Sequence, residues 1–509
     1  MDVLLSGANN ISSDIGISYN LGASVLRSKG YNSQSFANGL SIPNHFNLNF
    51  ATAPSFSSII VDKEIQSVYA NAQLSFRKWL YADVSARNDW SSTLPSPHSY
   101  FYPSAGLSLI LSDMVQMPAW ISFAKLRGSF TQVGNDADPY LLVQTYTYSP
   151  GAGNGFVSRD VTQYINNLKP EKTRSWEAGL EWKFLDGRIG LDATFYKSNT
   201  FNQLIFLGLP QASGYNQQYV NAGNIQNKGI EAMLSATPVQ TKDLSWNTSV
   251  NFALNRNKVI SLSSSVTQAS LSTATGLGSL LIKPGGSYGD IYDYDWAKDA
   301  KTGQYLVNAN GLPVISTLQR IGNFNPDYTL GWNNQLQYKK LTLSFLLDGR
   351  VGGILVSGTD AMMAYFGIAD YTTKYREGGL ILPGVMADGT PNAKAVSAEQ
   401  LWSSVSQGGR TGYAGFFAYS TTNFRLRELS LSYDWNFDQT LVKRVRVSLT
   451  GRNLFFLYKG KSLMDIPGIG KRTIPVDPEV AIGSSNYQGI ESGLLPGTRS
   501  YGLNVGVSF

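Results

Sequence analysis

Apolar residues occupy every second position over long stretches of the chain, with small or polar residues between them. The last stretch is the most regular, because Tyr501, Leu503, Val505, Val507 and Phe509 alternate with glycine, asparagine and serine. A period of two puts successive side chains on opposite faces, which predicts a β-strand with one apolar face. The pattern recurs in VYANAQLSF at 68–76, WEAGLEWKF at 176–184, WNTSVNFAL at 246–254, LTLSFLL at 341–347 and VRVSLTG at 445–451.

The faces opposite the apolar stripes carry charged residues, among them Glu177, Glu181 and Lys183 on one stretch and Arg444 and Arg446 on another. A sandwich core could not bury so much unpaired charge without a large energetic cost. These faces are therefore predicted to be wet, while the apolar faces meet lipid, as in a transmembrane antiparallel β-barrel. An ordinary β-sandwich is the alternative.

The links between the stripes alternate in length. About 14 strands of roughly 10–14 residues are predicted, which suits tilted crossings of a bilayer. Short periplasmic turns and long external loops are typical of outer-membrane barrels, so the carboxyl terminus is predicted on the periplasmic side. The short links lie near 78–80, 113–120, 186–187, 239–242, 339–340 and 438–442, and the long ones near 26–64, 90–100, 134–171, 200–225, 258–327, 352–422 and 457–498. Aromatic residues near the short turns are predicted to form an inner girdle: Trp79, Trp120, Trp182, Trp246, Tyr338, Trp435 and Phe437.

The composition agrees with this all-β interpretation. Aromatic residues make up 12% of the 509 positions and charged residues only 15%, below the roughly 25% of soluble domains. Mean hydropathy is −0.14 and no run of about 18 apolar residues occurs, which excludes a helical membrane protein. The net charge of +6 comes from scattered lysines and arginines without the clustered stripe that nucleic acid needs. The chain has no cysteine, and His45 and His98 are its two histidines, so no enzyme, cofactor or metal site is predicted.

The amino terminus carries no recognisable secretion signal. MDVLLSGANN at 1–10 lacks a basic segment, an adequate apolar segment and a small-residue cleavage site. If the protein is exported, the chain is expected to lack its original start.

Several longer motifs point to one family. They include AKLRGSFTQVGND at 124–136, NAGNIQNKGIEAML at 221–234, NFRLRELSLSYDW at 423–435, VDPEV at 476–480 and LPGTRSYGLNVGVSF at 495–509. In this order they resemble the carboxy-terminal part of SusC/RagA-type TonB-dependent transporters of the Bacteroidetes outer membrane. The resemblance implies a barrel of 22 strands when complete. Residues 1–509 are then expected to be its carboxy-terminal part, without the amino-terminal extension, plug and first strands. It also implies that Tyr501, Leu503, Val505, Val507 and Phe509 form the signal read by the barrel assembly machinery.

The resemblance further implies energy-coupled import of oligosaccharides, or of peptides. A SusD-like surface lipoprotein would cover the external loops, and TonB, ExbB and ExbD would drive release. Sugars stack on aromatic faces, and six aromatic residues in the predicted external loops are candidate platforms. Packing of these rings within the loops or against the lipoprotein is the alternative. The six residues are Trp296, Trp402, Tyr413, Phe416, Phe417 and Tyr419.

Two functions of other classes stay open at this point, a passive porin and a surface adhesin. Both would share the stripes and turns, and a plug with a TonB-contacting segment would distinguish an importer from them. Asp293, Asp295 and Asp299 hint at a cation loop, but the glycine and closing acid of a calcium loop are missing.

Overall fold

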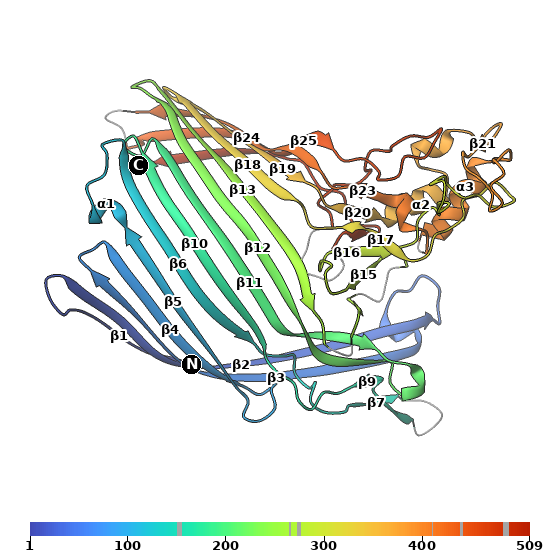
Figure 1. Cartoon of the computed structure of the whole chain (residues 1–509), viewed down its shortest axis with the longest axis horizontal. Coiled ribbons are helices and arrows are strands. Elements are labelled where there is room, and N and C mark those ends of the chain that lie inside the picture. Colours follow the sequence, from blue (N-terminus) through green and yellow to red (C-terminus); the bar gives the residue numbers. More distant parts are fainter. Residues whose placement is uncertain (150–154, 264–265, 272–275, 410, 438–440, 482–487) are drawn as a thin grey trace. The chain divides into compact units, whose positions relative to one another are not determined.

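The computed structural model describes residues 1–509 apart from 150–154, 264–265, 272–275, 410, 438–440 and 482–487 (Figure 1). Most of the described chain is strand, and its few helices are short. None of the described helices is long and apolar enough to cross a membrane. The residues group into two compact units, one of 1–109, 128–176 and 200–222, the other of 110–127, 177–199 and 223–509.

One large sheet contains the striped stretches. Its hydrogen-bonded neighbours follow chain order, with the loop strands left out, and β1 and β27 stand at the two ends of that order in the described residues. The sheet consists of β1 (Asp2–Asn10), β2 (Ile15–Leu40), β3 (Ala51–Phe76), β4 (Leu80–Ser91), β5 (Ser99–Ile110), β6 (Ile121–Asn135), β10 (Glu171–Phe184), β11 (Ile189–Gly208), β12 (Gln217–Gln240), β13 (Leu244–Ser261), β18 (Tyr328–Tyr338), β19 (Leu341–Val351), β24 (Asn423–Asn436), β25 (Arg444–Lys459) and β27 (Ser500–Ser508), with β9 (Thr162–Gln163) beside β12. The fourteen predicted strands are present, and the DVLLSG segment adds β1 before them.

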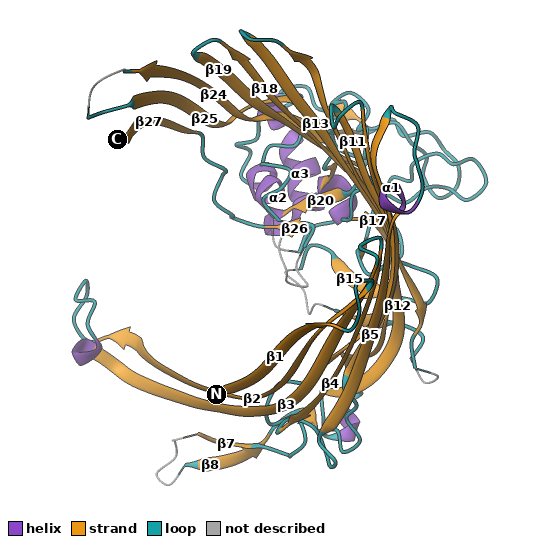
Figure 2. Cartoon of the chain, turned by 90° about the vertical axis from the view of Figure 1, so that its left-hand side faces the viewer, coloured by secondary structure: helices purple, strands orange, loops and turns teal. Residues whose placement is uncertain are grey.

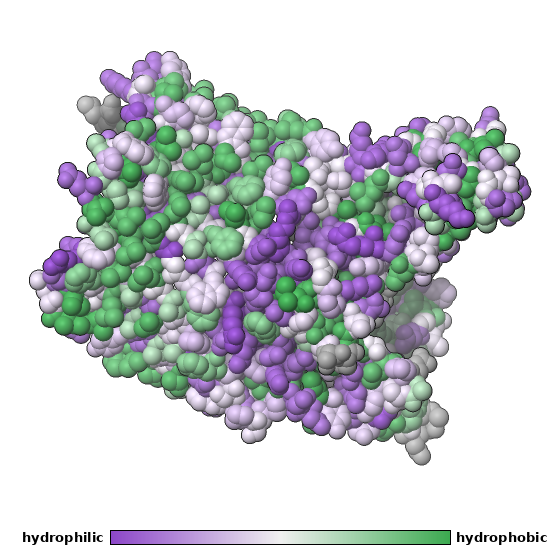
Figure 3. Space-filling model, in the orientation of Figure 1, coloured by the Kyte–Doolittle hydropathy of each residue, from purple (hydrophilic) through white to green (hydrophobic). Residues whose placement is uncertain are grey.

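The register aligns apolar with apolar and polar with polar residues across neighbouring strands. In the antiparallel pair β24 and β25, Leu431 lies opposite Leu449, and both side chains are exposed. On the other face Asp434 accepts hydrogen bonds from Arg444 (2.7 Å) and from Arg446 (2.9 and 2.7 Å). Cross-strand pairs of this kind stabilise a sheet and fix its register. In Figure 3 apolar residues gather over the left-hand parts of β12 and β13, and polar residues gather towards their right-hand ends.

The structure shortens two predicted loops. Strands β11 and β12 continue through most of 200–225 and leave a link at 209–216, and a longer stretch is shortened in the same way. The stretch 26–64 was expected to be a long connection, but β2 and β3 continue through most of it and leave a turn at 41–50. The extension is stabilised across the pair, where Arg27 forms an ion pair with Asp62 (2.7 Å) and Asn38 donates to Ser55 (3.2 Å). The sequence pattern did not predict these strands because both of their faces are exposed to water. Their backbone groups still pair across the strands, and this pairing needs no apolar face.

The last strand, β27, runs antiparallel to β25. Leu503, Val505 and Val507 lie opposite Leu449, Val447 and Val445. The predicted stripe therefore continues the apolar face of the neighbouring strand. Exposed side chains in this stripe are Tyr501, Leu503, Val505, Val507 and Phe509.

The long connections of the second unit fold into a small body that we call the cap, made of the described residues within 262–327, 352–422 and 460–491. Figure 1 shows it past one end of β18, β19, β24 and β25, and Figure 2 shows α2, α3 and β20 within the curve of these strands. Its elements are β14 (Ala269–Ser270), β15 (Ser279–Ile282), β16 (Asp290–Asp293), β17 (Gln319–Asn323), β20 (Ile354–Ser357), α2 (Gly358–Tyr365), β21 (Leu380–Ile381), β22 (Ala395–Val396), α3 (Ala398–Ser406), α4 (Ala414–Phe417), β23 (Ala418–Ser420) and β26 (Ile490–Glu491). Outside the cap lie β7 (Tyr146–Ser149), β8 (Phe156–Arg159) and α1 (Leu111–Met114).

A glycine pair lets the chain leave β19 and enter the cap. Gly352 and Gly353 both have φ of +79°, a left-handed conformation that other residues rarely adopt. A Cβ at Gly353 would lie 2.7 Å from Thr421 Oγ1 and 2.8 Å from the carbonyl oxygen of Phe324. Only glycine fits this junction without a shift of its neighbours.

Candidate functional site

Strands of the second unit line an open cavity of about 480 Å³ with both polar and apolar residues. The Arg127 guanidinium donates to Asp192 (2.6 Å) and to Thr194 (2.6 Å), while Glu231 and Asp348 line the same cavity. Residues two apart on a strand share a face, so the alternation seen in the sequence concentrates these groups on one wall. Carboxylates and guanidinium groups can bind hydroxyl and amide groups of a polar ligand.

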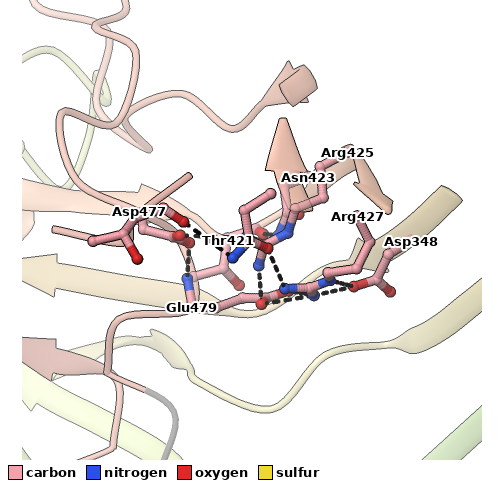
Figure 4. Close-up of polar contacts among 9 residues, drawn as sticks. Asp348, Thr421, Asn423, Arg425, Arg427, Asp477 and Glu479 are labelled. Carbon is pink, nitrogen blue, oxygen red and sulfur yellow. Dashed lines mark hydrogen bonds and ion pairs between the residues drawn. The ribbon is translucent and has the colours of Figure 1, made fainter. Parts of the chain in front are cut away.

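A cluster of five charged side chains joins this wall to the 476–480 segment of the cap. We call it the clasp, and it consists of Asp348, Arg425, Arg427, Asp477 and Glu479 (Figure 4). Arg427 donates to Asp348 and to Glu479 (3.0 Å). Arg425 donates to Asp477 (3.3 Å) and also to Glu479. The clasp therefore holds residues 476–480 against β19 and β24.

The geometry of the clasp follows from matched spacing. Arg425 and Arg427 stand two apart on β24. Arg425 pairs with Asp348 of β19 and with Phe456 of β25, whereas Arg427 lies in a bulge between Leu426 and Glu428 and has no ladder partner in the described strands. Asp477 and Glu479 are also two apart, and the Asp477 carboxylate accepts the backbone N–H of Glu479 (2.9 Å), which holds the acidic turn in place. Both motifs were visible in the sequence as NFRLRELSLSYDW and VDPEV, but neither was assigned to a site. Their equal charge spacing was the signal that could have paired them.

The cap has a hydrophobic core, and five of the six predicted aromatic platforms belong to it or to an adjoining small cluster. The Trp296 ring lies 6.0 Å from that of Phe416, and the Trp402 ring lies 6.4 Å from that of Phe417. These four rings and Tyr419 are 0–2% exposed. In this structure these five rings, Trp296, Trp402, Phe416, Phe417 and Tyr419, pack within the loops, which is the alternative given for them above, and their binding of a sugar stays a prediction.

Tyr413 differs from the other five because its ring is only partly buried. It meets the Tyr294 ring edge-on at 6.2 Å, and its hydroxyl accepts a hydrogen bond from Gln407 (2.6 Å). Tyr294 is exposed beside it. The sequence could not separate Tyr413 from its neighbours, since the burial of a loop aromatic depends on distant segments.

A buried cation holds the core of the cap together. The Arg472 guanidinium lies 4.7 Å from the ring centre of Tyr371 and 5.4 Å from those of Trp402 and Tyr419. It forms an ion pair with Asp360 (3.4 Å), whose carboxylate also accepts hydrogen bonds from both tyrosine hydroxyls, at 2.9 and 2.5 Å. Burial raises the pKa of Asp360, and the nearby Arg472 opposes that rise. Cation–π contacts and the ion pair together offset the cost of burying the charge.

The three aspartates considered as a cation loop serve the cap's own backbone. Asp293 accepts the N–H of Ala414 (3.0 Å), and Asp299 closes a turn by accepting the N–H of Thr302 (2.7 Å). Burial raises the pKa of both Asp293 and Asp295. Among the described residues no group of three histidine, cysteine or acidic side chains could hold a metal ion.

Comparisons with known proteins agree with the fold. Residues 4–454 match the family model described as "TonB dependent receptor-like, beta-barrel". The chain is 24% identical to "TonB-dependent receptor P3" of Formosa agariphila over 498 residues, covering 89% of this chain and 46% of that protein. It is also 24% identical to "TonB-dependent receptor SusC" of Bacteroides thetaiotaomicron over 390 residues, covering 73% of this chain and 35% of that protein.

Among solved structures the chain resembles the RagAB peptide importer in its closed-closed state. The TM-score is 0.73 at 21% identity, over 99% of this chain and 55% of that one. The chain thus spans about half the length of the relatives and structures it matches. These matches confirm the predicted resemblance to the SusC/RagA type and the predicted all-β, outer-membrane barrel fold.

Proposed function

Because this chain belongs to the family of TonB-dependent receptor β-barrels of the outer membrane, we propose that it forms the wall and outer cap of an active importer. Its cargo is a large nutrient, an oligosaccharide or a peptide, and the RagAB relative is itself described as a peptide importer. A SusD-like surface lipoprotein covers the cap, and TonB, ExbB and ExbD supply the energy from the periplasmic side.

The cap is the observation that carries this proposal. Its connections, 262–327 and 352–422, greatly exceed the ordinary length of about 12–15 residues, and they bury a core of their own instead of trailing into solvent. A rigid body on the strand ends can select cargo and offer a lid a firm surface. A passive pore needs neither property.

The wall beneath the cap supports a polar cargo. The cavity of about 480 Å³ is lined by one cation, Arg127, and three acids, Asp192, Glu231 and Asp348. Such positive and negative groups suit sugar hydroxyls and peptide amides. Of the six predicted platforms, Tyr413 is only partly buried and lies against the exposed Tyr294, which supports a stacking role for this pair. The other five would first have to leave the core.

Uptake measurements in cells test the proposal. For this test an affinity tag is inserted in the exposed turn at 301–303 of the protein, and nothing is added after Phe509. We expect uptake of labelled oligosaccharides or peptides that stops when TonB is deleted, and co-purification of a surface lipoprotein. Uptake that continues without TonB would favour a passive porin, and surface binding without uptake would favour an adhesin.

A further inference from the structure

A second cavity, of about 360 Å³, lies at the end of β25 nearest the cap. It is lined by β24 and β25 and by the segments 475–480 and 494–499 of the same unit. Three of its lining residues are cations, Arg425, Lys459 and Arg499, and one, Asp477, is an acid. The cavity therefore carries an excess of positive charge, unlike the wall cavity, where three acids face one arginine.

The positive charge of this cavity is only partly compensated. Arg425 is 4% exposed and bound to the clasp acids, yet its Nε is buried with no hydrogen-bond partner in the described part of the chain. Lys459 is half-buried, and its ammonium lies 5.3 Å from the centre of the Phe456 ring. Among the described residues neither Lys459 nor Arg499 forms an ion pair, although Asp477 acts on the charge of Lys459 from farther away, and Arg499 is exposed. A half-enclosed ammonium without an ion pair is costly, and a bound anion would lower that cost.

The rest of the cavity lining is mostly apolar. Phe455 and Phe456 of β25, Val480 and Pro496 contribute to it, next to the lysine and the arginines. A ligand that fits both parts has a negative group joined to an apolar body. An ammonium and a guanidinium that line one cavity can each donate to an oxygen of a carboxylate.

We propose that this cavity binds the carboxylate of an imported ligand whose adjoining part is apolar, the chemistry of a peptide's carboxyl terminus. The inference rests on the proposed import function and narrows its cargo from oligosaccharide or peptide to peptide. An acidic sugar offers the same carboxylate but lacks the apolar body, so the two sources can be separated. Lys459 and Arg499 act on the carboxylate, while Phe456 and Val480 receive the side chain next to it.

Calorimetric titration of the purified full-length transporter in detergent tests this site. The probes are a tetrapeptide ending in leucine, the same peptide with an amidated end, and a tetrasaccharide of uronic acids. Loss of a charge-assisted hydrogen bond weakens binding by about tenfold or more. We expect that loss on amidation, and again in Lys459→Gln and in Arg499→Gln with the free peptide. Arg452→Gln is the matched control, because Arg452 lies on β25 and pairs with Glu428 away from the cavity.

Equal affinity for the free and the amidated peptide overturns the carboxylate site, as does wild-type affinity in both variants. Equal affinity for the uronate and the peptide overturns the peptide assignment. Uptake of the same probes by cells with and without TonB is measured in parallel. Uptake that needs TonB but is equal for the free and the amidated peptide would refute the carboxylate site and still support the import function. Uptake that does not need TonB would refute the import function itself.

Discussion

Replacing Arg472 by methionine removes the buried cation around which the cap core is packed. The guanidinium is 4% exposed and Asp360 beside it is 1% exposed, so the pair is dry. Removing one partner of a buried pair costs about 3–5 kcal/mol, because the other charge stays buried. Asp360 keeps two tyrosine donors, and its pKa is already raised by burial, so it can take up a proton when the cation is lost. We therefore expect the lower end, about 3 kcal/mol.

Hydrogen exchange followed by mass spectrometry measures this loss in the full-length protein. Since about 1.4 kcal/mol corresponds to a factor of ten, amides of α2 and α3 should exchange about a hundred times faster in Arg472→Met. Arg472→Met combined with Asp360→Asn removes both charges and should recover part of the protection. Lys471→Met, at an exposed neighbouring position, is the control. Unchanged exchange in α2 and α3 of Arg472→Met would refute the reasoning.

Three further changes test other parts of the structure. Deleting Phe509 should lower the amount of folded protein in the outer membrane if the terminal stripe is an assembly signal; normal amounts of heat-modifiable barrel on gels would contradict this. Asp293→Asn keeps an oxygen acceptor for the N–H of Ala414, whereas Asp293→Ala should destabilise the cap by about 1–3 kcal/mol. Because burial raises the pKa of Asp293, this residue favours the folded cap below its unfolded pKa of about 3.9 and loses that effect as pH rises through the raised value. Cap melting curves of Asp293→Asn should lack this pH dependence. Gly353→Ala should destabilise the junction by about 1–3 kcal/mol, since it forces a side chain against Thr421 in a left-handed conformation; wild-type exchange in β20 would argue against it.

Much of the sheet could be predicted from the sequence because its environment changes from one residue to the next. The stripe from Leu449 towards Val445 has lipid on one side and water on the other, so a period of two is visible locally. The register of β24 on β25 agrees with that pattern, with Leu431 opposite Leu449. The strands of 26–64 escaped because both of their faces are wet, and nothing in the local pattern then separates a strand from a loop.

The site was harder to predict because its contacts join distant segments. Trp402 and Tyr419 were predicted as candidate platforms in the loops, but they pack in hydrophobic clusters and contact Arg472, which comes from another connection. The clasp likewise joins Arg427 on a strand to Glu479, 52 positions later. In the sequence such contacts are visible only as charged residues at equal spacing on each segment. That spacing does not show which two segments contact each other.

The paired strands β2 and β3 have a consequence for how a cell carrying this protein meets its surroundings. Each has 26 residues, whereas a tilted crossing of the hydrocarbon layer takes about 9–11. At about 3.3 Å per residue, roughly 50 Å of hydrogen-bonded ribbon is left over on the turn side, stiff but wet on both faces. Its side chains support no core, so substitutions there cost little folding energy. If this end of the strands is the external one, as the alternation of links predicts, antibodies and phages that recognise the ribbon would meet a target free to change its sequence while the barrel stays intact.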